Sequence, residues 1–410
     1  MGVDDKKVLV LGAGLVSGPL VDFYSRQSKV QVTVATESRE DAHRLVKSNI
    51  TPFVIDVQRE SDMLDQLIRD HDLVVSLLPF SFHPLVAKLC IKNRINMVTS
   101  SYVSPELEAL DQPAKDAGVT IMNESGLDPG IDHMLAMECI DEVANHGGKV
   151  TSFVSFCGGL PAPEYSDNPL RYKFSWSPKG VLTALLNPAK YLQDGKEVEI
   201  ASGKVVDHLY PIDFLPGFNL IGYANRDSVK YGGIYGITPG CRTLIRGTLR
   251  YKGFVEAVKA LDAVGLLNTQ PQEVFNPVSG PDLTWKQLMA SLLNQKLDIF
   301  PDSLCNVATE RVGGTNQIGV KALCDLGLFS DVVPDRHGCA LDTLAAYLAK
   351  VRAISRRNDN PLFNRSVVMF SGEIQRPGIV RPISKEIYRP ALKRLADYGI
   401  VATKEVTPMP

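Results

Sequence analysis

The chain has 410 residues, 44% of them hydrophobic and 22% charged, and its 44 Lys and Arg against 46 Asp and Glu give a formal net charge of −2. This length predicts two or three domains with sizeable cores. The balanced charge argues against nucleic acid or an anionic membrane surface as the main partner, and no apolar run is long enough to span a bilayer.

The first predicted element is a short apolar run that ends at Gly12 and Gly14 and is followed by an amphipathic stretch. A G-x-G turn between a strand and a helix is typical of dinucleotide binding: Gly12 allows a sharp turn, and Gly14 leaves room for a pyrophosphate at the helix N-terminus. Ser17 replaces the usual third glycine. A second β-rich run, residues 30–35, leads to Glu37, which lies 23 residues after Gly14, near the spacing of an acid that binds ribose. Taken alone, the G-x-G could also be an ordinary strand-to-helix turn.

Further apolar runs follow, each continuous rather than alternating. They are residues 52–55, 72–78, 96–99 and 119–122. Continuous runs are typical of strands covered on both faces, as in a parallel sheet wound with helices. We therefore predict an α/β fold with a Rossmann-like, doubly wound parallel sheet over residues 1–128. Ligands of such sheets bind beyond the carboxyl ends of the strands.

The pattern changes after residue 128. Residues 129–251 predict a second α/β domain with a mixed or antiparallel sheet, which would bind substrate. Residues 252–350 predict a mostly helical subdomain inserted beside it. Residues 351–410 predict a shortened C-terminal segment, in which 351–380 show no firm periodicity and resemble a loop, while 384–397 form a closing helix.

Several longer motifs punctuate the chain. They are DLVVSLLP (72–79), TSSY (99–102), GLDPGIDH (126–133), CGGLPAPE (157–164), YKFSWS (172–177), NRDS (225–228) and RGTLRY (246–251). Together they resemble the L-glutamate-forming saccharopine dehydrogenase/reductase family, known as a free-standing fungal enzyme and as the C-terminal half of the animal aminoadipate-semialdehyde synthase. The resemblance implies an oxidoreductase of lysine metabolism that converts saccharopine, NAD and water to L-glutamate and 2-aminoadipate 6-semialdehyde, or the reverse.

The resemblance also implies site residues. The implied cofactor contacts are Gly12, Gly14, Leu15, Val16, Ser17, Thr36, Glu37, Ser38, Ile55, Asp56, Leu77, Thr99, Ser100, Gly126, Leu127, Asp128 and Trp176. The implied saccharopine contacts are Ser100, Ser101, Tyr102, Arg226, Thr248, Leu249, Arg250 and Tyr251. Asp128 and Tyr102 are the catalytic candidates; alternatively, Asp128 only fixes the substrate amine.

Charge chemistry supports part of this set. Saccharopine is a secondary amine with three carboxylates, and the fork of an Arg side chain suits a carboxylate best. Arg246, Thr248 and Arg250 alternate along the sequence, so on a strand they would share one face. The alternatives are a solvated basic face of an edge strand and, for Arg226, a weak surface ion pair.

Glu37 sets the expected choice of cofactor. A carboxylate there accepts hydrogen bonds from the ribose hydroxyls of NAD but would repel the 2′-phosphate of NADP. In NADP-using members of the resembled family this position is an Arg, and Arg39 is the nearby cation in this sequence. We therefore expect NAD to bind at least about tenfold more tightly than NADP, about 1.4 kcal/mol. The alternative is that Glu37 points to solvent.

Three other side chains each have two interpretations. His133 is either a structural histidine or a proton carrier, and Cys157 is either a small hydrophobic residue or a nucleophile. Trp176 belongs either to the core or to a lid on the nicotinamide ring. The seven cysteines include no Cys-x-x-Cys pair, so we expect reduced thiols, no metal and a cytoplasmic protein.

Other functions remain open on the sequence. In the resembled family several tens of residues precede the closing helix, and residues 351–383 are too few to supply them. One alternative is thus an inactive, dinucleotide-binding paralogue or splice form. The other is a related NAD(P)-linked amine or imine oxidoreductase. We expect a homodimer, and a mitochondrial location if the chain is a piece of a larger bifunctional enzyme.

Overall fold

The computed structural model describes residues 6–213, 215, 217–351 and 376–407. These residues form two compact units, which are described one at a time. Unit 1 holds residues 6–150, 235–237 and 376–407, and unit 2 holds the described residues of 151–234 and 238–351. None of the described helices is long and apolar enough to cross a membrane.

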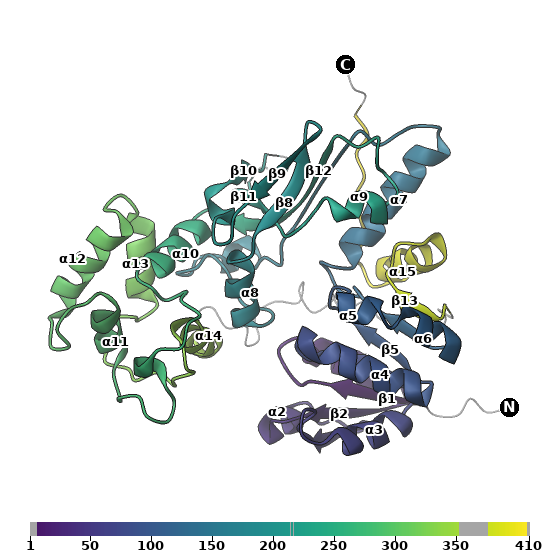
Figure 1. Ribbon diagram of the computed structural model, residues 1–410, viewed down its shortest axis with the longest axis horizontal. Helices are drawn as coiled ribbons and strands as arrows, with labels where there is room; N and C mark the ends of the chain where they lie inside the picture. The colour runs from purple at the N-terminus through teal and green to yellow at the C-terminus, as the bar shows by residue number, and fades with distance from the viewer. Residues whose placement is uncertain (1–5, 214, 216, 352–375, 408–410) are drawn as a thin grey trace. The chain divides into compact units, whose positions relative to one another are not determined.

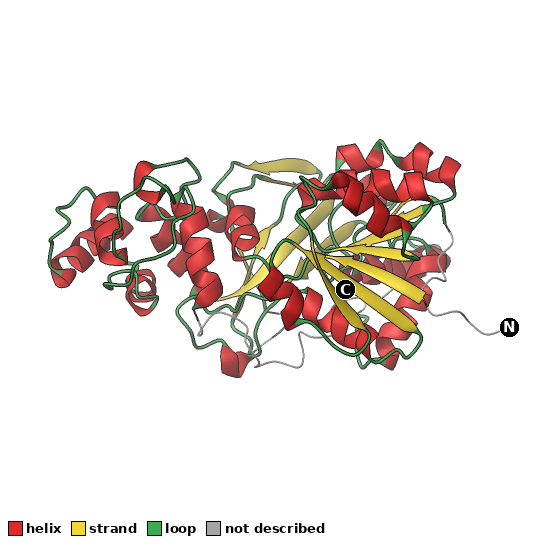
Figure 2. Cartoon of the chain, turned by 90° about the horizontal axis from the view of Figure 1, so that it is seen from below, coloured by secondary structure: helices red, strands yellow, loops and turns green. Residues whose placement is uncertain are grey.

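Unit 1 is built on a seven-stranded, wholly parallel sheet in the order β13-β6-β5-β4-β1-β2-β3 (Figures 1 and 2). Its strands are β1 (Lys6–Leu11), β2 (Val30–Thr36), β3 (Ile50–Val54), β4 (Leu73–Ser76), β5 (Asn96–Thr99), β6 (Thr120–Met122) and β13 (Gly378–Val380). The predicted Rossmann-like parallel sheet is therefore confirmed.

Helices cover both faces of this sheet. They are α1 (Ser17–Ser25), α2 (Arg39–Arg44), α3 (Ser61–Arg69), η1 (Phe80–Phe82), α4 (His83–Asn93), α5 (Pro105–Glu108), α6 (Asp111–Ala117), α7 (Ile131–Asn145) and α15 (Lys385–Asp397). Leu9 and Leu11 of β1 belong to one buried cluster, while Val8 and Val10 belong to another. Neighbouring side chains of a strand point to opposite faces, so both faces of β1 are buried, which explains its continuous apolar run.

The C-terminal part of the described chain completes unit 1. Strand β13 pairs with β6, so the predicted loop at 351–380 is wrong for residues 378–380, while 352–375 lie outside the described residues. Helix α15 packs along α7 (Figure 1) through Tyr388, which is fully buried and donates a hydrogen bond to Asp141 at 2.5 Å. Unit 1 thus includes α7 and α15, whereas the predicted first domain ended at residue 128.

Unit 2 contains a six-stranded sheet. Its strands are β7 (Ser152–Cys157), β8 (Ala189–Gln193), β9 (Lys196–Ile200), β10 (Leu209–Pro211), β11 (Leu220–Ala224) and β12 (Thr243–Tyr251). The order is β10-β11-β12-β8-β9, and β7 also pairs with β12. The β7–β12 pair is parallel and the other pairs are antiparallel, as in the mixed sheet that the sequence predicts.

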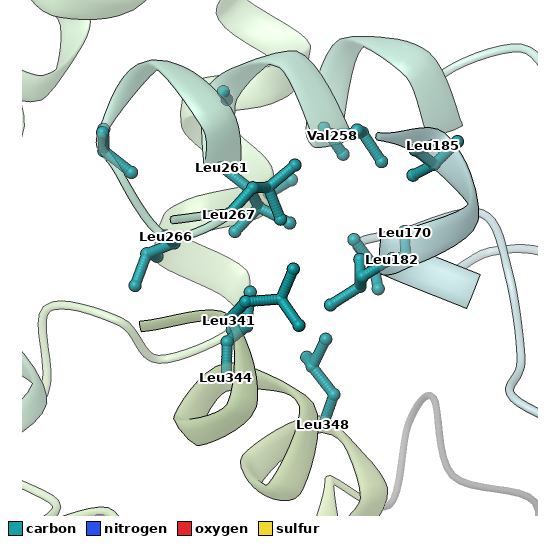
Figure 3. Close-up of a cluster of buried hydrophobic side chains, with 14 of the residues drawn as sticks. Leu170, Leu182, Leu185, Val258, Leu261, Leu266, Leu267, Leu341, Leu344 and Leu348 are labelled. Carbon is teal, nitrogen blue, oxygen red and sulfur yellow. The ribbon is translucent and has the colours of Figure 1, made fainter. Parts of the chain in front are cut away.

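The helices of unit 2 pack mainly on one another. They are η2 (Pro163–Tyr165), α8 (Pro178–Leu185), η3 (Val205–Asp207), α9 (Lys230–Ile234), α10 (Phe254–Ala263), η4 (Glu273–Phe275), α11 (Trp285–Leu292), α12 (Pro301–Val312), α13 (Gln317–Asp325) and α14 (Ala340–Lys350). Figure 3 shows Leu182, Leu261 and Leu341, from α8, α10 and α14, turned toward one another. These leucines share one buried cluster with Ile245 of β12, so the helical stretch 252–350 and the sheet have a common core.

Candidate functional site

The glycine turn after β1 fits a dinucleotide phosphate. Gly12 has a φ of 99°, and a Cβ there would stand 3.1 Å from the carbonyl oxygen of Leu77. A Cβ on Gly14 would meet no atom within 4 Å, and α1 begins just beyond it with no side-chain cap. The turn therefore offers open space and uncapped N–H groups, which is what a pyrophosphate needs. The hydroxyl of Ser17 is buried and donates to the carbonyl oxygen of Gly14 at 2.6 Å, so it closes the turn.

The predicted cofactor residues collect at one edge of the parallel sheet. Thr36, Leu77 and Thr99 stand at or just beyond the carboxyl ends of β2, β4 and β5. Ile55 follows β3, is buried, and donates its N–H to the carbonyl oxygen of Thr36 at 3.0 Å. Beside it, the carboxylate of Asp56 accepts from the N–H of Gln58 at 2.9 Å. This edge is where doubly wound folds bind dinucleotides.

The segment after β2, which includes α2, contributes a cation that the sequence did not single out. Glu37 and Arg39 are exposed, and the hydroxyl of Ser38 caps α2 by accepting from the N–H of Asp41 at 3.1 Å. Arg44, at the end of α2, donates to the carbonyl oxygen of Ala13 at 2.8 Å. Because α2 has only six residues, the guanidinium at its C-terminal end lies next to the glycine turn.

A buried histidine joins the ends of β4 and β5. His83 Nδ1 lies 3.0 Å from the hydroxyl of Ser76, while Nε2 lies 2.8 Å from that of Ser101 and 3.1 Å from that of Thr99. Burial lowers the pKa of His83 to about 4, so the ring is neutral near pH 7. His83 was not among the predicted residues, yet it orients Ser101 and Thr99, which were.

The two catalytic candidates touch each other. The hydroxyl of Tyr102 donates to Asp128 Oδ1 at 2.7 Å. Asp128 belongs to a tight turn, closed by a hydrogen bond from the N–H of Gly126 to the carbonyl oxygen of Pro129 at 2.9 Å. A Cβ on Gly126 would lie 3.3 Å from the Cβ of Ser100, so the turn packs against the end of β5. The turn therefore holds the Asp128 carboxylate in a fixed place.

A second buried group lies behind this turn. His133 is fully buried; its Nδ1 lies 2.6 Å from the Tyr235 hydroxyl, and its Nε2 faces Glu124 Oε2 at 3.0 Å. Glu124 Oε1 accepts from the N–H of Val103 at 3.1 Å and from Arg381 at 3.2 Å. Burial pushes the pKa of Glu124 upward, but the contacts with His133, Val103 and Arg381 outweigh it and leave the pKa below its ordinary value.

In unit 2, β12 carries two buried arginines. Arg246 and Arg250 are only 5% and 7% exposed, and β12 is paired with β7 on one side and with β11 and β8 on the other. The alternative of a solvated face on an edge strand is therefore wrong. Leu249 and Tyr251 pack with Leu220 in a separate apolar cluster, so their side chains lie on the opposite face of β12 from Arg250.

Arg250 is a buried cation that makes no ion pair with any described residue. Its guanidinium carbon stands 4.8 Å from the ring centre of Tyr172 and 5.1 Å from that of Phe254. One Nη donates to the carbonyl oxygen of Leu249 at 2.8 Å, while the buried Nε has no hydrogen-bond partner among the described residues. A buried charge is costly unless it is paired, so this site fits an anionic ligand.

The remaining predicted residues are more exposed. Arg226 lies in a turn after β11, with a φ of 53°, and is exposed. Trp176 is 42% exposed rather than part of the core, and a Cβ on Gly180 would come within 2.3 Å of its ring. Cys157 ends β7 and is partly buried. Within the described ranges, no cluster of three or more His, Cys, Asp or Glu side chains could hold a metal ion.

Comparison with known proteins identifies two family domains in the chain, with the boundary between residues 122 and 126. A family model described as "Saccharopine dehydrogenase NADP binding domain" matches residues 8–122, and one described as "Saccharopine dehydrogenase C-terminal domain" matches residues 126–400. The "Saccharopine dehydrogenase [NADP(+), L-glutamate-forming]" of Saccharomyces cerevisiae is 38% identical, over 96% of this chain and 98% of its own. A solved structure titled as apo saccharopine dehydrogenase (L-Glu forming) from the same yeast has a TM-score of 0.81 and 36% identity, covering 96% of this chain and 97% of its own.

Animal relatives are longer. The mitochondrial alpha-aminoadipic semialdehyde synthase of Bos taurus is 40% identical over 98% of this chain but only 48% of its own length, so this chain spans about half of it. That alignment runs over 451 residues against 410 in this chain, so the relative carries residues with no counterpart here. The names of the fungal relatives and of the matched domain favour NADP over the NAD that we expected from Glu37.

Proposed function

The chain belongs to the saccharopine dehydrogenase family, and from this premise we propose that it is an L-glutamate-forming saccharopine dehydrogenase of lysine metabolism. When bound, the nicotinamide cofactor supplies the redox chemistry by exchanging hydride with the carbon next to the secondary amine of saccharopine. Water then completes the cleavage to L-glutamate and 2-aminoadipate 6-semialdehyde. The protein contributes binding, orientation and electrostatic stabilisation.

The observation that carries this proposal is the unpaired, buried guanidinium of Arg250. Saccharopine brings three carboxylates, and one of them would supply the counter-ion that the described residues do not. The rings of Tyr172 and Phe254 hold the guanidinium in place, so the charge is oriented before the ligand arrives. Thr248, two residues earlier on β12, would offer a hydroxyl on the same face.

In unit 1, we assign the handling of the amine proton to Asp128. Its carboxylate is held by the closed turn and by the hydrogen bond from Tyr102, so it is oriented to accept a proton or to fix the charged amine. Ser101, oriented by His83, would bind a polar group of the substrate from the neighbouring loop.

We propose NADP as the cofactor, on the support of the matched domain and the fungal names. The 2′-phosphate would find Arg39 and Arg44, the cations that open and close α2. Glu37 opposes this choice, and the exposure of its side chain lets the carboxylate turn to solvent. Titration of both cofactors decides the point: tighter binding of NAD would return the assignment to the one expected from Glu37.

One measurement tests the function as a whole: saccharopine-dependent formation of reduced nicotinamide by the full chain, with glutamate identified as a product. Turnover of simple amines or amino acids but not of saccharopine would favour the related amine or imine oxidoreductase. NADP binding without any turnover would favour the inactive relative. That alternative stays open because the bovine relative carries residues that have no counterpart in this chain.

We also propose that the protein is a homodimer. Light scattering of the purified chain, which measures its molar mass in solution, tests this directly. A mass equal to one chain at working concentration would rule the dimer out.

A further inference from the structure

Two cysteines of unit 2 face each other across a pair of helices. Cys305 is on α12 and Cys324 is on α13, and their sulfur atoms lie 3.6 Å apart. Cys324 is exposed and Cys305 is partly exposed, so small reagents can reach the pair. The two residues are 19 positions apart in the sequence, which matches no cysteine motif, and only the helix packing brings them together.

The helices hold the two sulfurs in place. Leu304 precedes Cys305 and Leu323 precedes Cys324, and both leucines are fully buried in the core of unit 2. A disulfide bond is about 2.05 Å long, so the sulfurs need to close by roughly 1.5 Å, which rotation of one exposed cysteine side chain can supply. The backbone of the two helices does not have to move far for the bond to form.

We propose that Cys305 and Cys324 are a reversible dithiol–disulfide pair that reacts with small-molecule disulfides such as oxidised glutathione. One thiolate attacks the glutathione disulfide, forming a mixed disulfide and releasing one glutathione thiolate. The second protein thiolate then attacks the protein sulfur of the mixed disulfide and releases the second glutathione. In sum, two protein S–H bonds are lost and one S–S bond forms, while two electrons and two protons convert glutathione disulfide to two thiols.

The surroundings of the two cysteines determine how fast the disulfide forms and which helices it would link. Burial, together with the contact with Cys305, raises the pKa of Cys324 to about 11, so little of that thiol is ionised near pH 7 and the reaction should accelerate as the pH rises. The bond would span the connection between α12 and α13. The side-chain amide of Asn316, which caps the N-terminus of α13, also donates to the carbonyl oxygen of Glu256 on α10 at 2.8 Å. The disulfide would therefore fasten α12 to a helix that is already tied to α10.

The test treats the full chain with oxidised glutathione, alkylates the remaining thiols and maps the peptides by mass spectrometry. We expect two fewer alkylated cysteines, the loss of two hydrogen masses, a linked peptide containing both residues, and full reversal by a thiol reductant. Cys139→Ser is the matched control, because Cys139 is an exposed free cysteine outside the pair, and this variant should leave the linkage unchanged.

Cys324→Ser should stop at a glutathione adduct on Cys305, since no second thiol can resolve it. Three outcomes with the wild type would each overturn the proposal. They are stable glutathione adducts on both cysteines, a disulfide from either one to Cys139, and two unmodified thiols after treatment at alkaline pH. The peptide map of the wild type decides this even if a variant fails to fold.

Discussion

Replacing Arg250 by Met should stabilise the free protein and weaken saccharopine binding at the same time. Leaving a guanidinium buried without a counter-ion costs several kcal/mol. The contacts with the rings of Tyr172 and Phe254 return about 0.5–2 kcal/mol each, and the hydrogen bond to Leu249 returns about 1 kcal/mol. Met keeps much of the apolar volume without the charge, so we expect the free energy of unfolding to rise by about 1–3 kcal/mol.

Saccharopine binding should change in the opposite direction. Loss of a buried, charge-assisted contact with a carboxylate costs about 2–5 kcal/mol, which is at least about a 30-fold weaker affinity. Arg250→Lys keeps the charge but loses the planar fork, so it should also weaken binding while leaving the charge buried. NADP affinity should stay unchanged in both variants, since Arg250 belongs to unit 2 and the glycine turn to unit 1.

Urea unfolding of the ligand-free protein and calorimetric titration with saccharopine measure the two effects. Arg242→Met is the matched control, because the Arg242 side chain is exposed and, among the described residues, donates only a long hydrogen bond, 3.3 Å, to the carbonyl oxygen of Asp194. It should change neither quantity. If Arg250→Met lowers the free energy of unfolding and leaves saccharopine affinity intact, the guanidinium is a structural element and our reasoning about the substrate site is wrong.

Four further substitutions test unit 1. Arg44→Gln should weaken NADP binding about tenfold, as expected for one lost phosphate contact, while Glu37→Gln should strengthen it; equal NADP affinities in a fluorescence titration would contradict the assigned 2′-phosphate site. Tyr102→Phe should lower kcat with little effect on cofactor affinity, because the hydroxyl orients Asp128; unchanged saturation kinetics would remove Tyr102 from the mechanism. The pKa of His83 is about 4 in the folded protein against about 6.5 when unfolded, so the unfolded chain takes up the proton first and stability falls as the pH drops through this window. Between pH 7 and pH 5, His83→Asn should lose about 2 kcal/mol less stability than the wild type in urea unfolding, and parallel losses would contradict the burial argument.

The parallel sheet could be predicted because its longer strands, such as β1, are long enough to show their burial in the sequence. Leu9 and Val10 point to opposite faces of β1 and are both fully buried, which makes the run continuously apolar. Strand β13 has only three residues, too few for any periodicity, and its partner β6 lies more than 250 positions earlier. The assignment of α7 to unit 1 also escaped prediction, because an apolar helix face does not reveal which core it will meet.

The candidate site could be predicted where one strand carries it. The alternation of Arg246 and Arg250 places both on one face of β12, and the sequence shows this directly. Their burial could not be predicted, because it depends on the neighbours of β12 in the sheet and on the rings of Tyr172 and Phe254. His83 escaped for a similar reason, since its hydrogen-bond partners come from two other strand ends.

The choice of cofactor shows how far a single side chain can carry a prediction. Glu37 stands where a ribose-binding acid is expected, and the rule built on it treats the end of β2 as the whole of the phosphate environment. The structure adds Arg44, which α2 brings back to the carbonyl oxygen of Ala13. Its charge is partly shared with Asp41, whose carboxylate lies 3.3 Å away. The preference between NAD and NADP therefore depends both on Glu37 and on the Arg44–Asp41 pair of α2. A rule that considers only the residue after the strand leaves out the charge of this pair.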